Sequence, residues 1–309
     1  MTTALRPMST GEVLDRTFNL YRNNFQLFAG IATILSLASL IGALLLVLMG
    51  VGVVGAAPPD FRNPASLLLV IFGWLIGYLL FYLIGYALSL GATIYAVSQV
   101  HLGNRTTIKE SYRRIRPQMW SIINIVVSIF LRIVGASILA YILIALVAVA
   151  AVAAGAAWLA AVLGFCGAVA GVVWVMSIAC KYALAVPVCL LEKIKGMAAL
   201  HRSKELAQGS LFRIFIVLLL VFVLNLAFSL GLQYGGGLIV ASIPFAAIAW
   251  NLLAGFIAST LSFPISNIAY SLFYYDQRIR KEAFDLQLMM EAVGQTPQGQ
   301  SAAAAPSIG

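Results

Sequence analysis

Six long apolar runs, separated by short polar, glycine-rich or proline-rich connectors, are the feature that most constrains the fold of this chain. A bilayer core about 30 Å thick is crossed by a helix of about 20 apolar residues, and each run reaches that length. We therefore predict an all-α integral membrane protein of about six transmembrane helices. The expected spans are residues 25–54, 66–98, 119–153, 157–190, 211–232 and 238–274.

Composition excludes a water-soluble globular domain. Of the 309 residues, 62% are hydrophobic and only 9% are charged, whereas soluble domains carry about 25% charged residues. The expected breaks between spans lie at Pro58–Pro64, at Gly155 and across the glycines of 231–237. The break at Gly155 is the least marked, because the residues around it are mostly alanine.

The basic residues predict the orientation of these spans. Lysine and arginine collect in cytoplasmic connectors of membrane proteins, and 17 of the 19 here fall on one side of the six-span arrangement. They are Arg6, Arg16, Arg22, Arg105, Lys109, Arg113, Arg114, Arg116, Lys181, Lys193, Lys195, Arg202, Lys204, Arg213, Arg278, Arg280 and Lys281. We expect a multi-pass plasma-membrane protein with both termini in the cytoplasm.

The predicted cytoplasmic side also carries nine of the ten acidic residues, so that its net charge is +8. A basic surface beside a bilayer attracts anionic headgroups, and we expect membrane lipids as partners. A separate membrane or cytoplasmic protein is a second possible partner. Nucleic acid is not expected, because no groove-reading motif is present.

A short amphipathic segment precedes each expected pair of spans, and the three segments contain Arg16, Arg113 and Arg202. Their apolar residues have helical spacing, so we expect helices that lie flat at the inner headgroups. A tail helix at 275–293, with Arg278 and Arg280, has the same pattern. Residues 1–293 would then form one membrane domain, and 294–309 a disordered tail.

Three stretches together resemble a known membrane domain: residues 5–18 (LRPMSTGEVLDRTF), 191–203 (LEKIKGMAALHRS) and 274–286 (YYDQRIRKEAFDL). In order and placement they are similar to the membrane domain of some bacterial glycerophosphoryl diester phosphodiesterases, over residues 5–290. The resemblance implies a lipid-associated module in the bacterial inner membrane. In the two-domain relatives a catalytic barrel follows this domain. The sequence here ends soon after Met290, so we expect the module to stand alone, without hydrolysis.

Arg132 and Lys181 are the most informative charges, because each is expected about a dozen residues inside a span and no acid lies in any span. Intramembrane charges are costly and often functional. One interpretation is a shared site for an anionic headgroup, with both cations pointing into the bundle. The other is snorkelling, in which the long side chains lift both charges to the inner interface.

No catalytic residue, cofactor or metal site is expected. The chain has no phosphate-binding loop, zinc spacing or nucleophile elbow, and its acidic residues are interleaved with arginine, which indicates solvated ion pairs. The first hypothesis is therefore a non-catalytic membrane module that binds lipid or a partner protein at the inner leaflet. The alternative is a small transporter or flippase-like carrier for an anionic lipid or metabolite.

The charge asymmetry predicts the outcome of cysteine labelling in intact cells. Cysteines at Asp60 and Gly235 should react with an impermeant reagent from outside, and cysteines at Glu110 and Gln300 should react only from inside. Labelling of residue 110 from outside would contradict the predicted topology.

Overall fold

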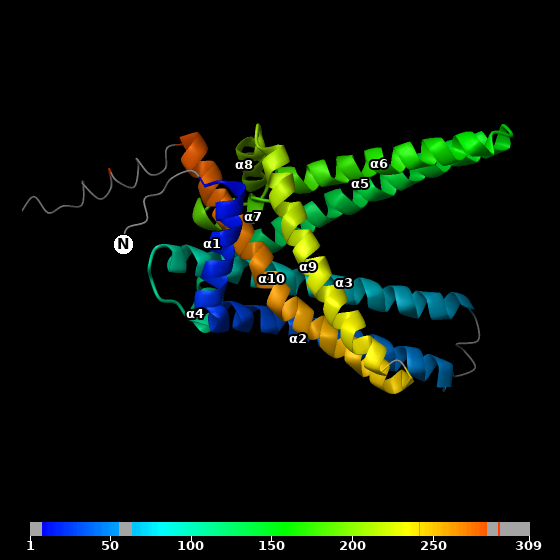
Figure 1. Ribbon diagram of the computed structural model, residues 1–309, viewed down its shortest axis with the longest axis horizontal. Helices are drawn as coiled ribbons and strands as arrows, with labels where there is room; N and C mark the ends of the chain where they lie inside the picture. Colours follow the sequence, from blue (N-terminus) through cyan, green and yellow to red (C-terminus); the bar gives the residue numbers. More distant parts are fainter. Residues whose placement is uncertain (1–7, 56–63, 241, 283–289, 291–309) are drawn as a thin grey trace, which may run out of the picture.

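The computed structural model describes residues 8–55, 64–240, 242–282 and 290, and every regular element in those ranges is a helix. The α-helices, shown in Figure 1, are α1 (Thr10–Asn23), α2 (Phe25–Gly55), α3 (Pro64–His101), α4 (Ile108–Ile115), α5 (Met119–Ala153), α6 (Ala157–Tyr182), α7 (Ala185–Leu191), α8 (Met197–Ala207), α9 (Leu211–Val240) and α10 (Pro244–Glu282). A single 3-10 turn, Arg116–Gln118, joins α4 to α5.

The predicted all-α fold with six spans is confirmed. Six helices in the described ranges are long and apolar enough to cross a bilayer: α2, α3, α5, α6, α9 and α10. The predicted bounds of the first three agree with the structure to within about three residues. At Gly155, α5 ends as expected. The residue has a φ of 74°, which glycine adopts without steric cost at the end of a helix.

The fourth expected span, 157–190, is divided between α6 and the short helix α7. Pro187 provides the physical reason. Its ring has no N–H to donate to the carbonyl of Ala183, and it crowds that carbonyl, so a continuous helix is disfavoured. The chain breaks at Ala183 and Leu184 and resumes as α7, most of whose side chains are buried.

The predicted bounds of the last two spans, 211–232 and 238–274, need correction. The glycines of 231–237 do not separate helices, because α9 continues through them to Val240, and α10 begins at Pro244. The indole of Trp250 lies against Gly236, and its Nε1 donates to the carbonyls of Leu232 and Gln233, each at 3.2 Å. The glycines thus allow close helix packing rather than a turn.

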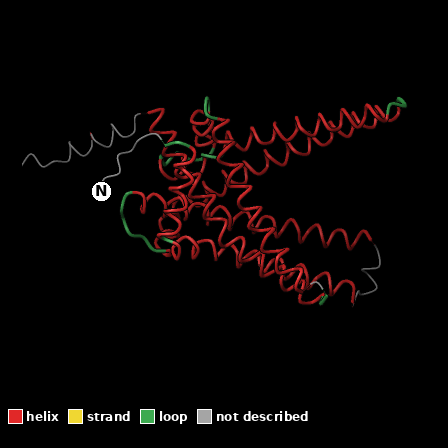
Figure 2. The backbone as a smooth tube through the Cα atoms, in the orientation of Figure 1, coloured by secondary structure: helices red, strands yellow, loops and turns green. Residues whose placement is uncertain are grey.

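The six spans form three helix pairs that meet at one end of the molecule. Figures 1 and 2 show α5 and α6 as an arm that diverges from the pairs α2/α3 and α9/α10. Helix α10 packs against both α9 and α2. Hydrogen bonds join these spans: Asn225 donates to Ser266 at 2.8 Å, and Ser259 donates to Ser36 at 3.0 Å.

The short helices α1, α4 and α8 lie where the pairs meet, and each precedes one pair, as the sequence predicted. Side-chain caps start two of them, since Ser9 accepts from the N–H of Glu12 and Thr107 from that of Glu110. Their most buried apolar residues, among them Val13, Ile115 and Leu200, belong to the protein core. Protein therefore covers these residues, and contact of the helices with lipid headgroups stays a prediction.

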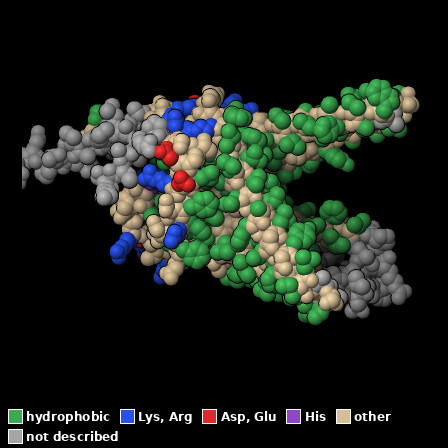
Figure 3. All heavy atoms as spheres, viewed as in Figure 1, with side chains coloured by type: hydrophobic (Ala, Val, Ile, Leu, Met, Phe, Trp, Pro, Cys, Tyr) green, Lys and Arg blue, Asp and Glu red, His purple; other side chains and the backbone are tan. Residues whose placement is uncertain are grey.

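Charge is concentrated at this same end. Figure 3 shows lysine and arginine side chains around the short helices and hydrophobic side chains along the arms. This distribution agrees with a multi-pass membrane protein whose basic residues lie on one side of the bilayer. We refer to this part of the molecule below as the charged end.

The C-terminal predictions are corrected in part. Residues 275–282 continue α10 instead of forming a separate tail helix. The rest of the predicted tail helix, apart from residue 290, and the predicted disordered tail of 294–309 lie outside the described residues. Gly235 lies inside α9, so Ser242, in the turn before α10, is the better position for the outside label.

We expect Gly236→Ala to destabilise the α9–α10 hairpin. A Cβ there would lie 1.9 Å from the Trp250 indole, and such overpacking costs about 1–3 kcal/mol. Gly231→Ala is the matched control on the same helix, because its Cβ would meet nothing within 4 Å. Thermal unfolding in detergent should show a lower Tm for the first variant only, and equal Tm values would contradict this packing.

Candidate functional site

A buried carboxylate, Asp276 on α10, organises one half of the charged end. It accepts from the backbone N–H of Met8 at 2.7 Å, from Arg213 of α9 at 2.8 Å and from Arg280 at 3.1 Å. Both guanidinium groups also donate to the Met8 carbonyl. The side chain of Asp276 is fully buried, so this cluster fixes the segment before α1 onto α9 and α10.

A second network joins the α7–α8 connection to α10. Arg202 pairs with Glu192 at 3.3 Å and with Glu282. Arg278 donates to Glu282 at 3.0 Å, and the hydroxyl of Tyr274 donates to Glu192 at 2.8 Å. Each charge has an opposite charge beside it, which offsets part of the cost of removing it from water.

The basic residues predicted to be interfacial differ in their surroundings. Arg202, Arg278 and Arg280 are 30, 18 and 37% exposed and pair with carboxylates of the protein. Arg113 is 72% exposed and lies 4.0 Å from Glu110. Arg16 is half-buried, contacts the Met8 sulfur, and burial lowers its pKa from the ordinary value.

The expectation that all the acidic groups form solvated ion pairs is wrong for Asp276. The segment at Met8 and the side chain of Arg213 cover this carboxylate. These contacts link residues more than 60 positions apart, and the local sequence pattern did not indicate them. Binding of the predicted interfacial residues to lipid headgroups stays a prediction.

Arg132 and Lys181 lie on α5 and α6, which pack against each other. The guanidinium of Arg132 donates to the carbonyl of Ser128 at 3.1 Å, contacts the Met197 sulfur at 3.5 Å and lies 5.4 Å from the ring centroid of Tyr182. It thus reaches back along α5 toward the charged end, as in snorkelling. The predicted sharing of one anion between Arg132 and Lys181 stays a prediction.

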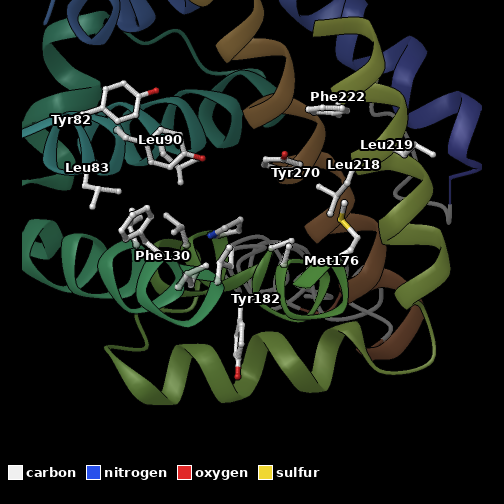
Figure 4. Close-up of a pocket in the computed structure, with 18 of the residues that line it drawn as sticks. Tyr82, Leu83, Leu90, Phe130, Met176, Tyr182, Leu218, Leu219, Phe222 and Tyr270 are labelled. Carbon is white, nitrogen blue, oxygen red and sulfur yellow. The ribbon is translucent and has the colours of Figure 1, made fainter. Parts of the chain in front are cut away.

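An apolar cavity of about 510 Å³ lies between the three helix pairs. Its lining comes from α3, α5, α6, α7, α9 and α10, and it contains no charged residue among the side chains that the structure describes. Small-molecule sites in proteins occupy about 300–1,000 Å³. Figure 4 shows Phe130, Met176, Phe222 and Tyr270, from four different helices, around this space. We refer to it as the central cavity.

Four tyrosines are among the residues that line the cavity: Tyr82, Tyr86, Tyr182 and Tyr270. Tyr82 and Tyr86 stack with ring centroids 6.4 Å apart, and Tyr86 meets Phe263 edge-on at 5.4 Å. Such contacts keep bulky rings in defined orientations. The cavity therefore has rigid aromatic walls and suits an apolar ligand.

Sequence reasoning missed this cavity. A partial signal was present, because aromatic residues recur at every fourth position of α3, at Trp74, Tyr78, Tyr82 and Tyr86, and the last two of these line the cavity. The opposite walls come from helices far away in the sequence, and only their packing reveals the space between them. In the described ranges, no group of three or more His, Cys, Asp or Glu side chains is arranged to hold a metal ion.

Comparison with known proteins gives one match. The family described as "Domain of unknown function (DUF8558)" matches residues 65–288, which include α3 to α10 almost completely. No curated protein and no solved structure matches the chain. The matched residues include the central cavity and both ion-pair clusters, apart from Met8.

We expect Asp276→Asn to destabilise the charged end strongly. The change removes the charge that compensates Arg213 and Arg280, and loss of one partner from a buried ion pair costs about 3–5 kcal/mol. Chemical or thermal unfolding in detergent measures this effect.

Glu110→Gln is the matched control for Asp276→Asn. It removes the partner of the exposed Arg113 and should change the free energy of unfolding by less than about 1 kcal/mol. Similar losses in the two variants would contradict a special role for the buried cluster.

Proposed function

The chain belongs to the DUF8558 family, a family of unknown function, and we propose from its geometry that it is a non-catalytic membrane module that binds the hydrocarbon chain of a lipid in the central cavity. The observation that supports this most is the uncharged lining of that cavity, contributed by all three helix pairs. An empty apolar space loses the dispersion contacts of its walls. In a bilayer, a lipid chain is the abundant apolar group that restores them.

The position of the cavity also supports a lipid ligand. Helices α3, α5, α6 and α9 all contribute to the lining, and Figure 1 shows the α5/α6 arm diverging from α3 and α9. Large hydrophobic side chains cover the outer surfaces of these helices. Hydrocarbon of the bilayer would therefore lie against the helices that line the cavity.

The resemblance to the membrane domain of glycerophosphoryl diester phosphodiesterases agrees with this proposal, since it implies association with lipid. We place the protein in the bacterial inner membrane with both termini in the cytoplasm, on the basis of its charge asymmetry. Anionic lipids, or a separate protein at the charged end, are its proposed partners.

The alternative function, a transporter or flippase-like carrier for an anionic lipid or metabolite, has less support. A carrier for a soluble anion needs a polar path, whereas neither Arg132 nor Lys181 is among the described residues that line the central cavity. A lipid whose chain stays in hydrocarbon does not need such a path. We therefore favour binding of a lipid over transport of a soluble metabolite.

Filling the cavity tests the proposal. Ala179 of α6 lines the cavity, so Ala179→Phe should exclude a hydrocarbon chain and reduce the number of lipids that co-purify. Ala168→Phe is the matched control, because Ala168 lies on the same helix with an exposed side chain. Native mass spectrometry after delipidation in mild detergent counts the bound lipids. Equal lipid counts for the wild type and Ala179→Phe would contradict binding in the cavity.

A further inference from the structure

We infer that the lipid of the central cavity carries an anionic headgroup of the phosphate class, and that Arg132 binds this headgroup. The inference rests on the proposed function, because it assigns the head of the molecule whose chain fills the cavity. It depends on three observations: the charge balance of Arg132, its position beside the cavity, and the donors that its guanidinium has available.

The first observation is that Arg132 differs from the arginines of the two ion-pair clusters. Arg202, Arg213 and Arg280 each lie within 4.0 Å of a carboxylate. No Asp or Glu among the described residues lies within that distance of Arg132, whose contacts are a carbonyl, a thioether and an aromatic ring. A charge at the membrane boundary is costly without an opposite charge. An anion from outside the chain would therefore stabilise Arg132.

The second observation is that Arg132 adjoins the cavity. Tyr182 is one of the residues that line the cavity, and its ring centroid lies 5.4 Å from the guanidinium carbon of Arg132. Ile129, Phe130 and Ile133 also line the cavity and are the neighbours of Arg132 along α5. The guanidinium is therefore close to residues that line the cavity.

The direction of the Arg132 side chain fits an amphiphile. Its hydrogen bond to the Ser128 carbonyl, four residues earlier in α5, directs the guanidinium toward the charged end. A headgroup bound there would lie on the side of the molecule where lipid headgroups are expected. Its hydrocarbon chain would extend past the Tyr182 ring into the cavity.

The third observation concerns the chemistry of the guanidinium. Arginine has five N–H donors, and in Arg132 one terminal nitrogen donates to Ser128 while the other contacts a thioether, which is a weak acceptor. Donors thus remain for an anion. The planar guanidinium matches phosphate oxygens in a two-point geometry, so it suits a phosphate-bearing headgroup.

Lipid selectivity tests this inference separately from the cavity. The full chain is reconstituted in nanodiscs of equal amounts of phosphatidylglycerol and phosphatidylcholine, extracted, and its bound lipids are identified by native mass spectrometry. The wild type should retain mainly phosphatidylglycerol. Arg132→Gln should lower the ratio of retained phosphatidylglycerol to phosphatidylcholine about tenfold, because both lipids carry a phosphate but the choline cation of phosphatidylcholine repels the arginine, so that only the net anion gains from the charge of Arg132.

Two further variants sharpen this test. Arg113→Gln removes the same charge from an exposed side chain and should leave the ratio unchanged. Arg132→Lys keeps the charge without the planar guanidinium, so it should give an intermediate ratio. An unchanged ratio in Arg132→Gln, in a variant that retains its wild-type Tm, would overturn the headgroup assignment, even where Ala179→Phe still reduces the total amount of lipid.

A titration of delipidated protein with inorganic phosphate distinguishes a lipid headgroup from a free anion. Phosphatidylglycerol should raise the Tm in an Arg132-dependent manner, and inorganic phosphate at the same concentration should not. Equal stabilisation by phosphatidylglycerol and by inorganic phosphate would contradict binding of a lipid and would indicate a site for a free anion. If Arg132→Gln loses selectivity while Ala179→Phe has no effect, the contact between Arg132 and the headgroup is supported. The central cavity is then rejected as the binding site of the hydrocarbon chain.

Discussion

Neutralisation of arginine by carboxylates at the charged end is the interaction on which the rest of this structure depends. Asp276 compensates Arg213 and Arg280, and Glu192 and Glu282 compensate Arg202. Without these pairs, cations would be held at the boundary of an apolar medium, where solvation is poor. These pairs hold together the short helices, the segment at Met8 and the ends of the spans. We refer to this assembly as the joint, and the six apolar helices extend from it.

The three stretches that resemble the phosphodiesterase membrane domain provide most of this joint. Met8 lies in residues 5–18, Glu192 and Arg202 lie in 191–203, and Asp276 lies in 274–286. Their shared property in this chain is thus a structural one: they bring distant segments together. None of the residues that line the central cavity falls in these stretches. The proposal of a lipid ligand therefore rests on the cavity itself.

The central cavity follows from the way in which the helix pairs are joined. Short helices and ion pairs hold the pairs together at one end, and from there the α5/α6 arm diverges from the other two pairs. Bulky aromatic side chains such as Tyr86 and Tyr270 line the space between diverging helices without filling it. In lipid, no hydrophobic effect closes such a space, because hydrocarbon chains are as apolar as the side chains. Arg132, without a carboxylate partner in the described chain, lies beside this space.

The sequence by itself determined the six spans, the clustering of charge on one side and the three short helices near Arg16, Arg113 and Arg202. Each depends on local properties: the length of an apolar run, the position of basic residues and helical spacing. Only the tertiary structure decided that α9 continues through the glycines of 231–237, that Asp276 is buried, and that α3, α5, α6, α9 and α10 line a cavity. The physical reason is that these features arise from contacts between residues far apart in the chain. A glycine run has the same local pattern whether it turns or packs against a tryptophan, and the contact of Gly236 with Trp250 decides between the two.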